Sequence, residues 1–169
     1  MPIVNGAGSS SSGGGLFTAY AYLRDEKASG AAGGDGVAAT WNTRTLNTKV
    51  YDPSSIVTLA ANQFTLAAGT YVIVGRAPAL FVGKTRTRIR DITNGATVGL
   101  GASTFADAGA VTSSPDCWVH GRVIVAGSTV YELQHYTQAN AGFGVGLGTP
   151  TTTGENEVYA EAWITKASA

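Results

Sequence analysis

Short runs of apolar or alternating apolar and polar residues recur along this chain, and turn residues separate them. The runs predict strands at residues 39–46, 56–59, 63–66, 70–76, 85–92, 97–99, 117–126, 129–136 and 158–166. Gly, Pro, Asn and Ser between the runs favour turns. No stretch keeps a helical spacing of apolar residues, and short strands at even intervals are typical of a β-sandwich or barrel.

The segment before this series predicts one more strand and then a loop. Residues 16–23 read LFTAYAYL and alternate, which is typical of a strand. Residues 24–35 contain the charge cluster RDEK and several glycines, so we expect a loop there. Further along, residues 94–95 (Asn-Gly) and 127–128 (Gly-Ser) each separate two predicted strands, and both pairs predict β-hairpins.

The N-terminal residues differ in composition from the rest of the chain. After the apolar tip Pro2-Ile3-Val4, residues 5–15 read NGAGSSSSGGG, which is typical of a flexible linker. We expect residues 1–15 to be an anchoring arm whose tip adds to the sheet edge of a partner protein. A disordered tail is the alternative, because termini are often disordered.

Residues 16–169 have the length of one domain with a single core. The chain carries 11 basic and 11 acidic residues, and charged residues make up only 13% of it. A net charge of zero argues against a dedicated nucleic-acid binder and against a polybasic membrane-surface protein. Low charge favours self-association. One cysteine, Cys117, excludes an intrachain disulfide, and we expect neither a secretory signal nor a membrane-spanning segment.

Several patterns resemble catalytic or cofactor motifs without matching them. The GKT sequence at residues 83–85 ends like a phosphate-binding loop, but Pro78 stands where that motif needs a glycine. His120 and His135 lie on separate predicted strands, without the clustered ligands that a zinc site needs. No serine lies in a nucleophile elbow, and nothing marks two carboxylates as a glycosidase pair. We therefore expect no catalytic residue, metal site or cofactor.

Two segments are candidates for contacts between subunits. In the run GFGVGLG at residues 142–148, glycines alternate with larger residues such as Phe143 and Val145. Such a run permits close backbone approach, either between subunits or over the sandwich itself. In the last predicted strand, Tyr159 and Trp163 lie on one face and alanines on the other. This strand is either central with an oligomer contact on one side, or simply a core strand of a monomer.

Arg86, Arg88 and Arg90 alternate along one predicted strand and therefore project from one face of a sheet. Guanidinium groups bind carboxylates in bidentate geometry, so this arginine row is a candidate site for acidic sugars or for a carboxylate-bearing neighbour. The alternative is a solvated face whose arginines pair with Glu132 or Glu161.

Five sequence blocks between residues 40 and 166 carry a resemblance to a known fold through their order and spacing. They are TWNTR followed by LN at 40–47, LAAGTY at 66–71, RIRD at 88–91, VYELQH at 130–135 and YAEAWI at 159–164. Together they resemble the complement globular-head and tumour-necrosis-factor-like jelly roll, in the form found in bacteriophage structural proteins. The resemblance implies an all-β jelly-roll sandwich of two antiparallel sheets with an extended N-terminal arm. It also implies a homotrimer with both termini near one end, and no enzyme activity.

These features favour a bacteriophage structural protein on the virion surface, made in the host cytoplasm. We expect a trimeric head-decoration or cement protein that binds the major capsid protein or another virion protein through residues 1–15. The short arm favours this function, because a tail fibre usually has a collagen-like or coiled-coil shaft. The alternative is a receptor-binding protein of a tail tip or fibre, which would bind host glycans through the arginine row and loop aromatics such as Phe105. We expect no binding of nucleic acid and no membrane insertion.

Overall fold

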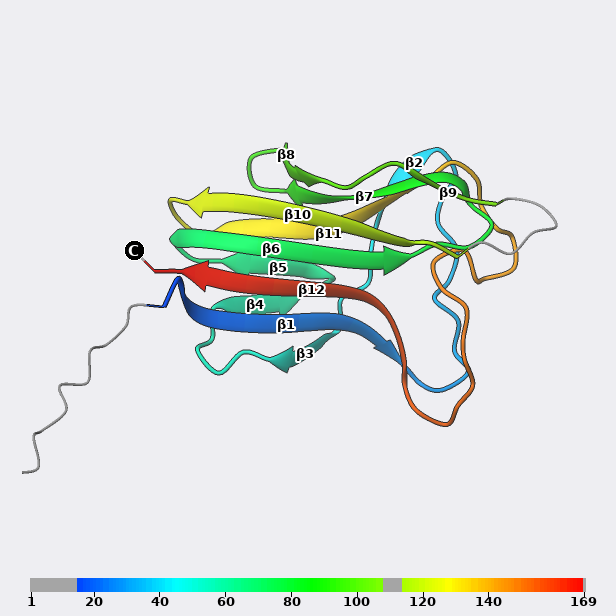
Figure 1. The fold of residues 1–169 in the computed structure, drawn as a ribbon, viewed down its shortest axis with the longest axis horizontal. Helices are drawn as coiled ribbons and strands as arrows, with labels where there is room; N and C mark the ends of the chain where they lie inside the picture. Colours follow the sequence, from blue (N-terminus) through cyan, green and yellow to red (C-terminus); the bar gives the residue numbers. More distant parts are fainter. Residues whose placement is uncertain (1–14, 108–113, 169) are drawn as a thin grey trace, which may run out of the picture.

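A computed structural model describes residues 15–107 and 114–168, which form strands and loops without any helix. Two antiparallel sheets pack face to face (Figure 1). The five-stranded sheet has the order β10-β6-β12-β1-β3. The seven-stranded sheet follows β4-β5-β11-β7-β8, with β2 also paired to β11 and β9 to β7. This arrangement confirms the expected jelly-roll sandwich.

The strands of the described residues have the following bounds, in chain order: β1 (Phe17–Lys27), β2 (Thr40–Thr43), β3 (Thr48–Tyr51), β4 (Val57–Ala60), β5 (Gln63–Leu66), β6 (Gly69–Pro78), β7 (Gly83–Asp91), β8 (Ala96–Leu100), β9 (Thr104–Ala106), β10 (Asp116–Val125), β11 (Thr129–Thr137) and β12 (Glu157–Ala167).

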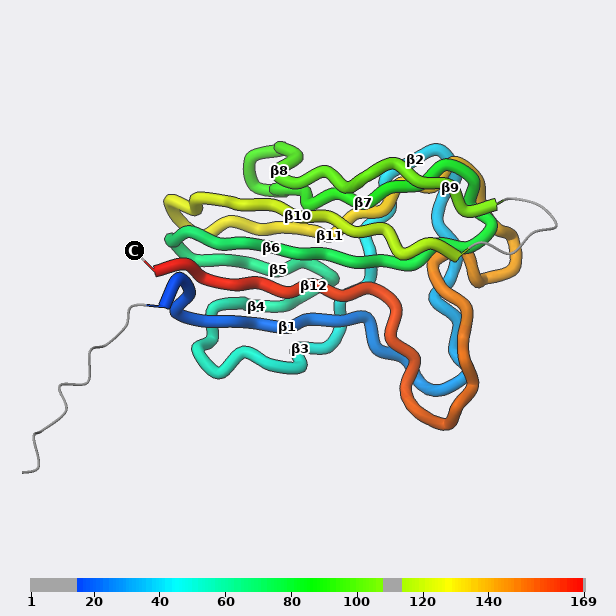
Figure 2. The backbone as a smooth tube through the Cα atoms, in the orientation of Figure 1, coloured from blue at the N-terminus to red at the C-terminus, as the bar shows by residue number. Residues whose placement is uncertain are grey.

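The first and last described strands lie side by side. β1 pairs with β12 along most of its length, and the Ser168 amide donates to the Leu16 carbonyl at 3.1 Å. The described chain therefore begins and ends at the same end of the sandwich. Two long connections, residues 28–39 and 138–156, lie at the opposite end (Figure 2). The predicted anchoring arm, with Pro2, Ile3 and Val4, lies outside the described residues.

The core fills the space between the two sheets and follows from the alternation within each strand. In β10, every second side chain from Cys117 to Val125 is buried, and the side chains between them are exposed. The buried set includes Leu23, Phe64, Ile73, Leu133 and Ile164. Burial of one such side chain contributes about 1.5–3 kcal/mol, so this alternation fixes which face of each strand points inward.

Gly75 shows how closely the sheets approach. A Cβ atom at this position of β6 would lie 2.7 Å from Leu133 Cδ1 and 3.0 Å from Val119 Cγ1. Only glycine leaves room for the Leu133 side chain of the opposite sheet, so the sequence places glycine within a central strand.

Three strand predictions need correction. Residues 24–27 belong to β1, because pairing of Glu26 with Val158 and of Lys27 with Glu157 extends the strand through the charge cluster. β3 and β9 were not predicted: each pairs with a single strand, and neither has the run of buried apolar residues that marks a core strand.

One hairpin prediction is confirmed and the other is wrong. Asn94-Gly95 connects β7 and β8, which pair with each other. Gly127-Ser128 connects β10 to β11, but β10 pairs with β6 in one sheet and β11 lies in the other. Both strands face the same core from opposite sides. Alternation alone does not distinguish two strands that pair from two strands that face each other.

Candidate functional site

The outer face of the five-stranded sheet carries a cluster of aromatic side chains, which we call the aromatic face: Tyr20, Tyr22, Tyr51, Trp118 and Trp163. The Tyr22 ring stacks on Trp163, with centroids 5.6 Å apart and planes 1° from parallel. Trp118 stacks on the same indole at 5.7 Å and 9°. Tyr20 contacts Tyr51 at 5.9 Å. Several of these rings remain partly exposed, and Trp118 retains 46% of its accessible surface.

Strand register brings these rings together. Trp163 of β12 pairs with Tyr22 of β1, and Tyr22 pairs with Tyr51 of β3. Trp118 comes from β10 at the other edge of the sheet. In the part of the chain that the structure describes, no segment crosses this face (Figure 1). The aromatic face is therefore a broad apolar surface that residues 15–107 and 114–168 leave uncovered.

A polar group borders the aromatic rings and holds them in place. Glu161 accepts hydrogen bonds from the Tyr22 hydroxyl and from Arg76 Nη1, and Arg76 Nε also pairs with Asp116 at 3.1 Å. Burial and the neighbouring Glu161 carboxylate raise the pKa of Tyr22. The hydroxyl therefore stays protonated and can donate, so the ring that stacks on Trp163 has a fixed orientation.

The four residues predicted for subunit contacts are not brought together. Trp163 lies in the aromatic face. Tyr159, by contrast, is only 3% exposed, and its hydroxyl donates to the Ala31 carbonyl at 2.8 Å. Loops of the same chain cover its ring, so it offers almost no surface to another subunit. Phe143 is 79% exposed and Val145 is half-buried, both in the connection between β11 and β12.

The glycine-rich run 142–148 forms a loop rather than an extended strand. The Gly144 and Gly146 amides each donate to the Asp35 carboxylate at 2.9 Å, and the Gly33 amide donates to the Gly148 carbonyl at 2.8 Å. A Cβ atom on Gly33 would lie 2.6 Å from the Leu147 backbone. The close approach predicted from the glycines therefore occurs within the chain, where it joins the two long connections.

The arginine row lies on the outer face of the seven-stranded sheet. Arg88 stacks over the Trp41 ring at 4.1 Å and donates from Nε to Gln134 at 2.8 Å. Arg90 contacts the Thr97 hydroxyl at 3.5 Å. Among the described residues, none of the three arginines forms an ion pair with Glu132 or Glu161.

Those two carboxylates have other partners. Glu132 accepts from Thr43, Gln63 and Gln134. Glu161 lies on the other sheet and binds Arg76. Glu161 is therefore not a partner of the arginine row, whereas Glu132 lies on the same sheet, opposite Arg90, and its charge attracts that of Arg88.

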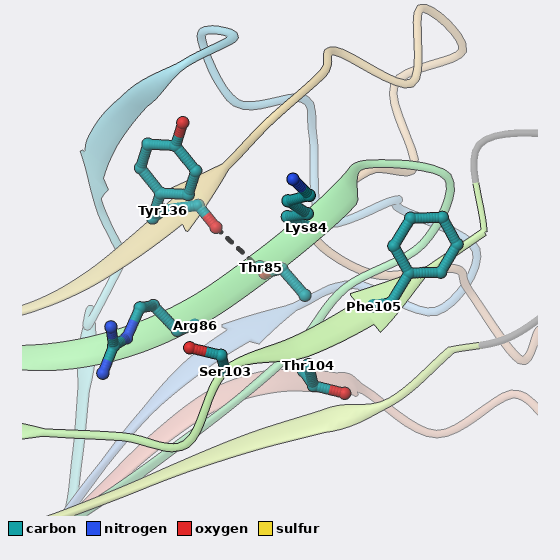
Figure 3. A pocket seen from close by; sticks show the side chains of 7 residues that line it. All are labelled: Lys84, Thr85, Arg86, Ser103, Thr104, Phe105 and Tyr136. Atoms are coloured by element: carbon teal, nitrogen blue, oxygen red, sulfur yellow. Dashed lines mark hydrogen bonds between the residues drawn. The ribbon is translucent and has the colours of Figure 1, made fainter.

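Arg86 lines a pocket of about 430 Å³ at the end of the same face (Figure 3). Lys84 and Phe105 are opposite each other on β7 and β9, and Arg86 is opposite Tyr136 of β11. Arg86 Nη2 donates to the Gly101 carbonyl at 2.9 Å, which fixes the guanidinium beside the pocket.

The two histidines occupy different environments. His120 is exposed on the outer face of the five-stranded sheet, whereas His135 is fully buried between the sheets. His135 Nε2 lies 2.6 Å from the Thr85 hydroxyl, and Cys117 Sγ lies 3.8 Å from the same hydroxyl. Within residues 15–107 and 114–168, no three His, Cys, Asp or Glu side chains are grouped so that they could hold a metal ion.

The GKT sequence at residues 83–85 is the start of strand β7, without the loop and helix of a phosphate-binding site. In the same described ranges, no helix is long and apolar enough to cross a membrane.

No protein-family model matches this chain, and no curated protein matches it. Solved structures do match. The globular domain of zebrafish complement 1qA protein covers 89% of this chain and 96% of its own length, at a TM-score of 0.51 and 16% identity. Murine APRIL covers 88% of this chain and 98% of its own length, at a TM-score of 0.53 and 7% identity. The vertex protein P5 of phage PRD1 covers 90% of this chain and 99% of its own length, at a TM-score of 0.53 and 16% identity.

At such low sequence identities, these structural matches show a common fold and nothing finer. The chain adopts the tumour-necrosis-factor-like jelly roll, which includes a phage vertex protein, and the resemblance inferred from the sequence blocks is confirmed at that level.

Proposed function

We propose that this chain is a non-enzymatic structural protein of a bacteriophage virion, which assembles as a homotrimer through its aromatic face and decorates the head. The main support for this proposal is the aromatic face. Stacked Tyr22, Trp163 and Trp118 form an apolar surface that the described chain leaves uncovered. Aromatic side chains are enriched at the centres of subunit interfaces, and an exposed apolar patch of this kind marks an interaction site.

The occupant that we propose for this face is another copy of the same chain. The resemblance to complement and tumour-necrosis-factor-like proteins implies a trimer, and a chain with zero net charge and few charged residues offers little repulsion between copies. The charged groups at its border, Arg76, Asp116 and Glu161, are paired within the chain. They therefore leave no unpaired charge to oppose the approach of a second copy.

We propose that residues 1–15 attach the protein to the particle. The Ser168 amide donates to the Leu16 carbonyl, so the described chain begins at one end of the sandwich, beside Ser168 and away from the long connections (Figure 2). In a trimer around a common axis, three arms would leave from the same end. Three weak tip contacts on one particle strengthen one another, because the second and third bind at high effective concentration.

Sedimentation of the full chain tests the assembly. We expect a trimer for the unmodified protein and a monomer for Trp118→Glu, which places a charge in the stacked face. Phe143→Glu is the matched control, because it also changes an exposed aromatic residue but lies in the 142–148 loop. A monomeric unmodified protein, or dissociation by Phe143→Glu with Trp118→Glu still trimeric, would overturn the aromatic face as the interface.

Experiments on purified particles test where the protein lies on the virion and whether residues 1–15 anchor it. Images of particles with and without the protein should show the difference density over the head. A chain lacking residues 1–15 should remain trimeric but occupy fewer sites on particles. Unchanged occupancy would exclude the arm as the anchor, and density at the tail tip would favour the receptor-binding alternative.

A further inference from the structure

The pocket at the junction of β7, β9 and β11 has a composition different from the aromatic face and lies on the other sheet. Its lining includes Lys84, Arg86, Ser103, Thr104, Phe105 and Tyr136 (Figure 3). Apart from Ser103, which precedes β9, these residues come from three strands that pair in register, so the sheet fixes their backbone positions. Two cations, the hydroxyl side chains of Thr85, Ser103 and Thr104, and two aromatic rings surround a space of about 430 Å³, and no carboxylate of the described residues lines it.

The two cations are available to a ligand. Among the described residues, neither Lys84 nor Arg86 forms an ion pair with a carboxylate. Arg86 donates from Nη2 to Gly101, while its Nε is buried without a hydrogen-bond partner in the described chain. The Lys84 ammonium and the rings of Tyr136 and Phe105 line the same pocket (Figure 3). A lining that combines cations with aromatic rings suits an anionic group that also has an apolar face.

The aromatic rings restrict the shape of that ligand. Phe105 is 56% exposed, although it lies on a paired strand and not at a loop tip. The Tyr136 ring contacts Trp41 edge to face at 5.7 Å, which limits its movement. Rings held in this way offer flat apolar surfaces for the C–H face of a sugar, and the Ser103 and Thr104 hydroxyls can exchange hydrogen bonds with its hydroxyl groups.

We infer that this pocket binds a carboxylate-bearing sugar residue of an acidic glycan, with Lys84 on the carboxylate, Phe105 and Tyr136 against the ring, and Arg86 toward the neighbouring unit. The whole chain has zero net charge, so the positive charge here is local and not a general property of the surface. Arg88 and Arg90 continue the row along β7 and would face the next acidic units of the same chain. The inference depends on neither the trimer nor attachment to a virion.

Calorimetric titration of the full chain with trigalacturonic acid tests the site. The neutral galactose trimer and dextran sulfate serve as comparison probes. We expect the carboxylated trimer to bind and the neutral one not to bind. Lys84→Gln and Phe105→Ala should each weaken binding about tenfold, because each removes one charge-assisted or one stacking contact. Lys84→Arg should keep most of the affinity, and Phe143→Ala should match the unmodified protein.

Because Lys84 and Phe105 are exposed, neither variant should unfold the domain, and circular dichroism verifies this. Equal binding of the neutral and carboxylated trimers, or no binding of the carboxylated trimer, would overturn the inference. Binding of dextran sulfate that Phe105→Ala leaves unchanged, with no binding of the carboxylated trimer, would indicate simple charge attraction and would overturn it as well. These outcomes leave the sedimentation result of the proposed trimer unaffected.

Discussion

The buried His135 should make this domain lose stability steeply in mild acid. Its Nε2 lies 2.6 Å from the Thr85 hydroxyl, and that hydroxyl donates its proton to the Tyr136 carbonyl at 2.9 Å. The Thr85 oxygen therefore accepts from His135, which places the imidazole proton on Nε2. Nδ1 is buried and has no partner in the described chain. A second proton on Nδ1 would have no acceptor and would lie near the charge of buried Arg44.

The size of the effect follows from the pKa. Burial, and then the Arg44 charge, lower the pKa of His135 from 6.5 to about 3. The unfolded chain takes up a proton near its ordinary pKa while the folded chain does not, so the stability contributed by neutral His135 is complete above pH 6.5 and decreases as pH falls toward 3. The slope approaches about 1.4 kcal/mol per pH unit below pH 6.5, so stability at pH 4.5 lies about 2.7 kcal/mol below its value at high pH.

Urea unfolding followed by tryptophan fluorescence measures this loss. The free energy of unfolding is determined at several pH values between 7.5 and 4.5, at one protein concentration because assembly also affects stability. His135→Gln removes the titrating group and should flatten the dependence, even if it lowers stability at every pH. His120→Gln changes the exposed histidine and should keep the slope. Parallel curves for the unmodified protein and His135→Gln would refute the reasoning.

Three further predictions concern other buried positions. Gly148→Ala should destabilise the domain by about 2–5 kcal/mol, because φ is +145° there and a Cβ atom would lie 2.0 Å from the Tyr159 ring; urea titration measures the loss. Glu157 accepts from the Gly30, Thr151 and Thr152 amides, which lower its pKa to about 2. Its stabilisation is therefore present above pH 4.5 and lost as pH falls toward 2, and Glu157→Gln should reduce the acid dependence of the melting temperature in that range. Cys117 is buried, and burial raises the pKa of its thiol, so a thiol reagent should react with it only at the rate of unfolding; rapid reaction of the folded protein would contradict its position.

The sequence alone determined the fold class and most strands. Alternation in residues 117–126 and 158–166 places alternate side chains on opposite faces, and one of those faces must be buried. The same pattern placed Trp163 with Tyr159 on one face of its strand and the three arginines on one face of theirs. The turn at Asn94-Gly95 was also predictable, because its conformation depends on those two residues themselves.

Only the tertiary structure decided which of these faces meet. Tyr22 and Trp118 lie 96 positions apart in the chain, and both stack on Trp163 because β1 and β10 flank the central strands of one sheet. Phe105 lies in the pocket because β9 pairs with β7, and Tyr159 is buried because loops of the chain cover its ring. Alternation specifies the face of a residue within its own strand. The neighbours of that face depend on strand order, which is fixed by contacts between segments far apart in the chain.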